Sequence, residues 1–188
     1  MSPPVDRENR TKETSEGEGP AGEGAGARAG GGDADAGDAA AGGATEVELR
    51  AHHLLCMLTF AGKGYSPGFV ARFEEVAAAI NAGAAVKIVD GPDPLCACVI
   101  AAEKEPHCFK ASVTERDRKA ARDVGENLGL TIEAGTVIPL SRARVDEMRA
   151  WFHQGTTRPA CTGCEWDTLC TRLAEGGFEG CRVRGVFR

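Results

Sequence analysis

Apolar residues recur at helical spacing in three segments of the chain. The first begins at Ser66-Pro67, where serine is a good N-cap and proline suits the first helical position, and it ends at Gly83. The second covers residues 112–129 and opens with a capping box, Ser112-x-x-Glu115. The third covers residues 141–155, and a shorter helix is expected to end near Glu175. The spacing predicts amphipathic helices in these segments.

Shorter apolar stretches predict strands and one buried turn. Residues 46–50, 85–89 and 136–140 are short enough and apolar enough for strands. Residues 52–60, HHLLCMLTF, predict one or two buried helical turns, and residues 95–111 predict an irregular segment. The fold class expected is therefore α+β, helix-rich with two or three short strands in a single small domain, with the topology left open.

The first 44 residues differ in composition from the rest. They contain no aromatic residue, no leucine and no isoleucine, and they carry nine acidic against four basic residues. A segment so poor in apolar side chains cannot offset the entropy lost on ordering. We expect a disordered, acidic, Gly/Ala-rich tail over residues 1–44, either a solubilising extension or an interaction arm, and a cysteine-rich metal- or cluster-binding domain over residues 45–188.

Charge and hydropathy indicate which partners the protein can bind and in which cellular compartment it is expected. The whole chain has a formal net charge of −6 and the tail −5, which leaves residues 45–188 at −1. A near-neutral domain lacks the basic footprint of a nucleic-acid-binding protein. No apolar run of about 20 residues indicates a membrane span, and no signal peptide is evident. We expect a cytoplasmic protein that binds neither nucleic acid nor membrane.

The eight cysteines carry the clearest chemistry in the sequence. In a reducing compartment, clustered cysteines indicate metal or redox chemistry more often than disulfides. The sharpest motif is Cys161-x-x-Cys164 followed by Cys170, which supplies three thiols within ten residues. The segment with Cys96, Cys98 and Cys108 is the expected source of a fourth ligand. The alternatives are unliganded thiols or a redox dithiol of the thioredoxin type.

Spacing favours an iron–sulfur cluster over zinc. Structural zinc sites use two short knuckles whose four ligands converge on one ion. If residues 165–170 are helical, Cys170 lies roughly 9 Å along the axis from Cys164, a span that suits a multi-iron cluster. The spacing does not choose between a [2Fe–2S] and a [4Fe–4S] cluster, and zinc stays as the alternative cofactor.

Several residues near these cysteines have open roles. His52, His53 and Cys56 share helix faces and form a weaker candidate group, for which a core position is the favoured interpretation. His107 is a nitrogen donor beside Cys108, and Trp166 is either a shield for a cluster or part of the core. Cys98 and Cys181 are the least expected to bind metal.

The chain resembles a family of small bacterial and archaeal proteins described as iron–sulfur binding. The resemblance runs from about Leu49 to Cys170 and rests on LRAHHLLCMLTFAGKGYSPGF, VDGPDPLC, His107-Cys108 and CTGCEWDTLC. Some relatives have C-x2-C where this chain has Cys96-Ala97-Cys98. The resemblance implies ligands at five positions: Cys96, Cys108, Cys161, Cys164 and Cys170.

The function expected from the sequence is that of an iron–sulfur protein of redox or sensing type with an electron-transfer or regulatory protein partner. The alternative is a zinc-stapled interaction module without catalytic activity. A third hypothesis is an enzyme that uses the HHLLC segment, although the chain contains no phosphate loop, nucleophile elbow or zincin helix.

Overall fold

The computed structural model describes residues 46–186. The tail predicted over residues 1–44 lies outside this range. Within it, six α-helices and a three-stranded sheet form the domain, so the prediction of a helix-rich α+β fold is confirmed.

The sheet is small and mixed. Its strands are β1 (Glu46–Leu49), β2 (Ala85–Ile88) and β3 (Val137–Ile138), in the order β1-β2-β3. β1 pairs with β2 in parallel, with Val47 opposite Val86, and β2 pairs with β3 antiparallel, with Val86 opposite Ile138. All three strands lie where the sequence predicts them, and β3 is shorter than the predicted 136–140.

Two long helices begin and end where the sequence signals do. α2 (Pro67–Ala82) starts at Ser66, whose Oγ accepts a hydrogen bond of 3.2 Å from the Phe69 N–H, and it ends at Gly83 with a left-handed φ of 113°. α5 (Arg142–Gln154) starts at Ser141 in the same way. Both N-caps satisfy a backbone N–H that the first helical turn leaves free.

The third long helix, α4 (Ala111–Leu128), does not use the predicted capping box. It starts one residue before Ser112, its N-cap position is Lys110, and no side chain caps it. Glu115 instead pairs with Arg118, three residues further along the helix. The capping-box prediction is therefore wrong, because Ser112 already lies inside the first turn.

The segment predicted to be irregular contains three short helices. They are η2 (Pro94–Cys96), α3 (Ala97–Ala102) and η3 (His107–Phe109). Asp93 starts the first of them, since its Oδ1 accepts a hydrogen bond of 3.0 Å from the Leu95 N–H. An aspartate before a proline is a local helix start that the prediction of an irregular segment overlooked.

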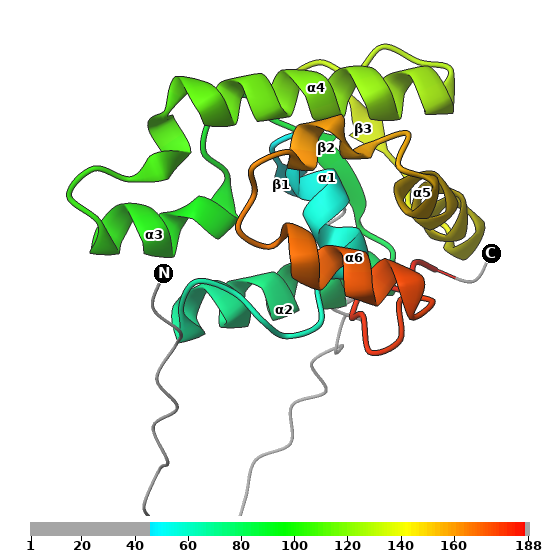
Figure 1. The fold of residues 1–188 in the computed structure, drawn as a ribbon, viewed down its shortest axis with the longest axis horizontal. Coiled ribbons are helices and arrows are strands. Elements are labelled where there is room, and N and C mark those ends of the chain that lie inside the picture. Colours follow the sequence, from blue (N-terminus) through cyan, green and yellow to red (C-terminus); the bar gives the residue numbers. More distant parts are fainter. Residues whose placement is uncertain (1–45, 187–188) are drawn as a thin grey trace, which may run out of the picture. The chain divides into compact units, whose positions relative to one another are not determined.

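The centre of the domain is a buried turn and a half of helix. α1 (His53–Cys56) continues directly into η1 (Met57–Thr59), as predicted for residues 52–60. Figure 1 shows α1 between α4 on one side and α2 and α6 (Asp167–Glu175) on the other. η4 (Arg158–Cys161) lies along α4, and α6 contacts η1. The two cysteine-rich segments therefore meet around α1 and η1.

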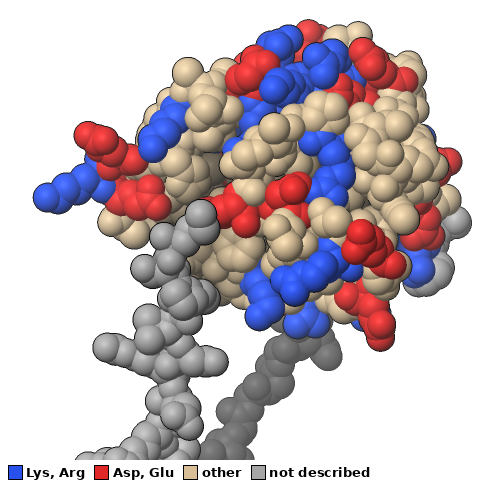
Figure 2. Space-filling view, in the orientation of Figure 1, with Lys and Arg blue, Asp and Glu red and all other residues tan. Residues whose placement is uncertain are grey.

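The surface carries charges of both signs. On the face shown in Figure 2, lysine and arginine side chains are interspersed with acidic ones, including over α4. None of the helices formed by residues 46–186 has the length and apolar character needed to cross a membrane.

Candidate metal centre

A cavity of about 90 Å³ lies between α1, η1 and the two cysteine-rich segments. Its volume is several times the roughly 10–15 Å³ that a single water molecule requires. Six of the eight cysteines line it: Cys56, Cys96, Cys108, Cys161, Cys164 and Cys170. All five cysteines selected from the sequence are in this set, and Cys56 joins them.

Four of these cysteines form the first group, called here the four-thiol group: Cys56, Cys161, Cys164 and Cys170. Burial raises the pKa of the Cys56 thiol well above its usual value, and the charges of the other three thiols raise it further. Burial also raises the pKa of Cys161 to about 11 and raises that of Cys170. A thiol in such surroundings stays protonated until a metal replaces its proton.

The local backbone turns the C-terminal thiols of this group inward. The Cys164 N–H donates to the Cys161 carbonyl over 2.9 Å, which closes a tight turn at this C-x-x-C motif. α6 begins only at Asp167, so Glu165 and Trp166 are not helical. Helical rise therefore does not set the distance between Cys164 and Cys170, and the sequence argument that used it does not apply.

The sulfurs of the four-thiol group surround the cavity. Four sulfurs bound at about 2.3 Å to one zinc ion lie roughly 3.8 Å apart. Among residues 46–186, the only group of three metal-ligating side chains whose ligand atoms all lie within 4.8 Å of one another is His53, Asp93 and Cys96. Within residues 46–186, that limit is met neither by three thiols of the four-thiol group nor by any set of three that includes Cys108.

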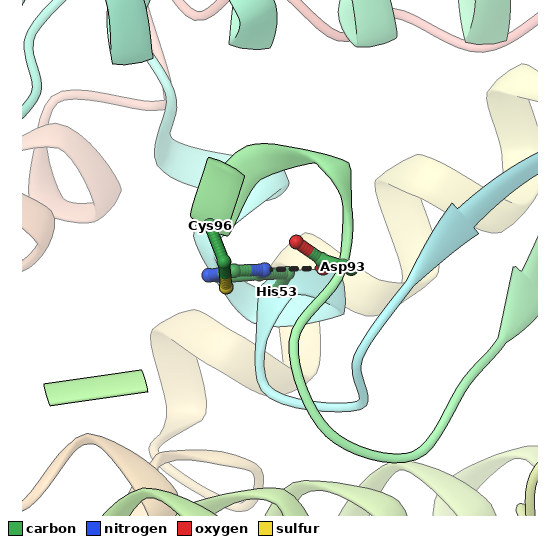
Figure 3. A group of neighbouring side chains, drawn as sticks. All are labelled: His53, Asp93 and Cys96. Carbon is green, nitrogen blue, oxygen red and sulfur yellow. Dashed lines mark hydrogen bonds and ion pairs between the residues drawn. The ribbon is translucent and has the colours of Figure 1, made fainter. Parts of the chain in front are cut away.

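The second group contains His53, Asp93, Cys96 and Cys108. His53 Nδ1 lies 2.6 Å from Asp93 Oδ2, and Figure 3 shows the His53 ring between this carboxylate and the Cys96 sulfur. Burial, followed by the charge of Asp93, raises the pKa of Cys96 to about 12, and the neighbouring Cys108 thiol raises it further. His53, Cys96 and Cys108 line the same cavity as the four-thiol group, whereas Asp93 lies behind His53 and does not.

A buried ionic network of Arg50 and Asp117 holds the His52 side chain in place. Arg50, only 1 % exposed, donates to Asp117 Oδ2 from Nε over 2.9 Å and from Nη2 over 2.6 Å. Asp117 Oδ1 accepts from the His52 backbone N–H over 3.1 Å and lies 2.6 Å from His52 Nδ1. Each histidine thus has one carboxylate on Nδ1, Asp117 for His52 and Asp93 for His53.

The network shifts the pKa values of its members. Burial alone would raise the pKa of Asp117, but hydrogen bonds from His52 and Arg50 outweigh it and lower the value to about 2. Burial lowers the pKa of His52 to about 4, and His53 adds to this effect, although Asp117 opposes it. Asp117 is therefore ionised and accepts hydrogen bonds, so His52 is neutral and donates from Nδ1.

Aromatic side chains form one edge of the cavity. Tyr65 packs edge-on against Trp166 with ring centroids 5.4 Å apart, and its ring also lies 5.2 Å from that of His107. All three residues line the cavity. Trp166 is half-buried, so it both packs against the domain and separates the thiols from solvent.

Sequence reasoning missed three residues that organise the site. Asp93 had a usable signal, because an aspartate before proline often caps a short helix. Arg50 and Asp117 had none, since a buried Arg–Asp pair 67 residues apart leaves no local pattern. Cys98 and Cys181, expected to be the least involved, are not among the residues that line the cavity.

A family model described as a protein of unknown function, DUF1284, matches residues 64–170, more than half of the 188-residue chain. The chain belongs to the DUF1284 family. The DUF1284 match contains Cys96, Cys108, Cys161, Cys164 and Cys170, whereas the HHLLC segment precedes it. The match is thus shorter at its N-terminal end than the resemblance seen from about Leu49. Neither the search of curated proteins nor that of solved structures gave a match.

Proposed function

We propose that this chain is an iron–sulfur protein of redox or sensing type whose cluster is bound by Cys56, Cys161, Cys164 and Cys170. The observation that carries the proposal is the arrangement of four cysteine thiols around one cavity. Four cysteine thiolates are the usual ligand set of both [2Fe–2S] and [4Fe–4S] clusters.

The proposed ligand set differs from the one expected from sequence. The sequence suggested Cys96 or Cys108 as the fourth ligand beside Cys161, Cys164 and Cys170. Cys56 is the better candidate because its thiol interacts electrostatically with all three of them. Thr59 strengthens the link, since its Oγ1 lies 3.2 Å from Cys170 Sγ and 3.4 Å from the Cys56 carbonyl oxygen.

The surroundings suit a cluster that transfers or senses electrons. When bound, an iron–sulfur cluster supplies one-electron chemistry, and hydrogen bonds and solvent exposure set its potential. Here Thr59 provides a donor and Trp166 limits solvent. All four cysteines of the group are only partly buried, so the proposed protein partner can approach a cluster closely at the surface of the domain.

The first experiment is to purify the full chain without oxygen and to measure its visible spectrum, iron, sulfide and zinc. The proposal expects a brown protein with matched iron and sulfide, at about two or about four atoms of each per chain. Cys56→Ser should lose both. Cys181→Ser is the matched control, because Cys181 is buried but does not line the cavity.

A colourless wild-type protein with one zinc ion per chain would contradict this proposal and favour the zinc-stapled interaction module. Full iron content in Cys56→Ser would contradict the ligand set alone. In that case Cys96 or Cys108 would be the fourth ligand of the cluster, as the sequence suggested.

A further inference from the structure

His53, Asp93 and Cys96 form the tightest cluster of metal-ligating side chains in residues 46–186. Their ligand atoms all lie within 4.8 Å of one another. All three residues are buried, with exposed fractions of 7 %, 6 % and 3 %. His53 comes from α1, whereas Asp93 and Cys96 come from the loop and short helix after β2. Buried groups of this kind occur in proteins when they are paired or bind a metal.

Three hydrogen bonds hold the Asp93 carboxylate in place. Its Oδ2 accepts hydrogen bonds from the Arg50 backbone N–H over 2.8 Å and from His53 Nδ1 over 2.6 Å. Its Oδ1 accepts the Leu95 N–H. Asp93 therefore orients the His53 ring through Nδ1. A carboxylate on one ring nitrogen, with the other nitrogen free, is the common arrangement of metal-binding histidines.

The free nitrogen of His53 is Nε2, and it faces sulfur. Figure 3 shows one ring nitrogen directed at Asp93 and the other on the opposite side of the ring, near Cys96 Sγ. Cys108 supplies a second sulfur, because its thiol is close enough to influence that of Cys96 and lines the same cavity.

Arg50 holds the two cysteines together. Its Nη1 donates to the Cys108 carbonyl oxygen over 2.9 Å and lies 4.0 Å from Cys96 Sγ. One buried arginine thus fixes the backbone of one proposed ligand and contacts the side chain of the other.

We propose that His53 Nε2 and Cys96 Sγ bind a single divalent transition-metal ion of the zinc type. Cys108 Sγ, which lines the same cavity, moves in to complete the donor set, and Asp93 is the positioning residue. One imidazole and two thiolates form a donor set that suits zinc. The site uses none of the cysteines of the four-thiol group. It therefore does not depend on the proposed iron–sulfur cluster.

The test is to supply Zn²⁺ to the full chain under anaerobic conditions, remove the excess, and count zinc, iron and sulfide in the same sample. Wild-type protein should retain one zinc ion per chain. His53→Gln and Cys96→Ser should bind zinc at least about tenfold more weakly, with iron and sulfide unchanged. Asp93→Asn should weaken zinc binding by about 10–100-fold, as loss of a supporting carboxylate usually does.

Cys98→Ser is the matched control. Cys98 lies two residues from Cys96 and packs against Gly68 of α2, outside the cavity, so its substitution should leave zinc unchanged. Zinc-edge X-ray absorption of the wild-type protein should show both nitrogen and sulfur neighbours. Far-UV circular dichroism shows whether each variant is folded. If Cys96→Ser does not fold, His53→Gln and Asp93→Asn still test the site.

Two outcomes would overturn the second site. One is unchanged zinc binding in folded His53→Gln and Asp93→Asn. The other is loss of iron, sulfide and zinc together in His53→Gln, which would indicate one site and not two. By contrast, a wild-type protein with no iron but with zinc that depends on His53 would refute the iron–sulfur proposal and support this one.

Discussion

Thr59 Oγ1 lies 3.2 Å from Cys170 Sγ, and this hydrogen bond joins residues 111 positions apart in the sequence. Thr59 ends η1, and Cys170 lies in the middle of α6. The same oxygen is 3.4 Å from the Cys56 carbonyl, but it has one hydrogen to donate. A thiolate is a stronger acceptor than a carbonyl, so metal binding at Cys170 directs the hydrogen to the sulfur.

Replacement of Thr59 by valine should lower the reduction potential of the proposed cluster. Valine keeps the shape of threonine but cannot donate to Cys170. A hydrogen bond to a ligand sulfur stabilises the reduced, more negative cluster. A hydrogen bond worth about 1 kcal/mol corresponds to roughly 40 mV for one electron. Redox titration followed by visible absorbance or electron paramagnetic resonance measures the shift, and an unchanged or higher potential would contradict it.

Trp166→Leu should make the cluster decay faster in air. Trp166 lines the cavity and packs against Tyr65, so a smaller side chain opens a path for oxygen and water. We expect a several-fold shorter half-life of the visible absorbance after exposure to air. Trp151→Leu is the matched control, because Trp151 is also partly buried but does not line the cavity. Equal decay in the two variants would show that Trp166 is no more than a packing residue.

Asp117→Ala should destabilise the domain strongly. Asp117 is the acidic partner of Arg50, which is 1 % exposed and would be left buried beside Cys96 without a carboxylate. Removal of one partner of a buried ion pair costs about 3 kcal/mol or more in the free energy of unfolding. Urea unfolding measures this loss. Glu115→Ala, on the same helix, removes only a surface pair with Arg118 and should cause no measurable change.

If Asp117→Ala and Glu115→Ala have the same free energy of unfolding, the Arg50–Asp117 ion pair does not stabilise the domain. This result would mean that the Cys108 carbonyl and surrounding water are enough to accommodate the Arg50 charge.

Local chemistry explains which parts of the fold the sequence predicts. Ser66 and Gly83 delimit α2 because each satisfies helix-end groups through its own side chain or its own φ. The capping box at Ser112 fails for a related reason. The turn of η3 before it ends at Lys110 and starts α4 there, so the serine is already within the helix. A Ser-x-x-Glu capping box can start a helix, but here the preceding turn η3 places the helix start at Lys110, before Ser112.

The candidate site depends on contacts that no local pattern encodes. Sequence spacing selects Cys161, Cys164 and Cys170 because they lie within ten residues. It places Cys56 only in a weaker candidate group with His52 and His53, for which a core position is the favoured interpretation, since cysteine is a common small core residue. Only the packing of α6 against η1 brings Cys56 to the other three. The same holds for Asp117, which reaches His52 from a different helix.

His52 should make the metal-free domain sensitive to mild acid. The folded-state pKa of His52 is about 4, below its ordinary 6.5, because burial disfavours the charged ring. Between these two pH values the unfolded chain binds a proton at His52 and the folded chain does not, so stability falls as the pH is lowered. The loss is on the order of 3 kcal/mol over this interval. Asp117, with a pKa of about 2 against the ordinary 3.8, adds a second loss below pH 4 for the same reason.

Urea unfolding of the metal-free chain at several pH values tests this dependence. His52→Gln retains a donor for Asp117 but cannot titrate, so the fall in stability between pH 6.5 and 4 should shrink, whereas the fall below pH 4 should remain. His153→Gln is the control, because His153 is exposed on α5 and its loss should leave both falls unchanged. If His52→Gln and wild type show parallel profiles from pH 6.5 to 4, the buried ring is not the group that unfolding protonates. The acid sensitivity would then belong to the carboxylates alone.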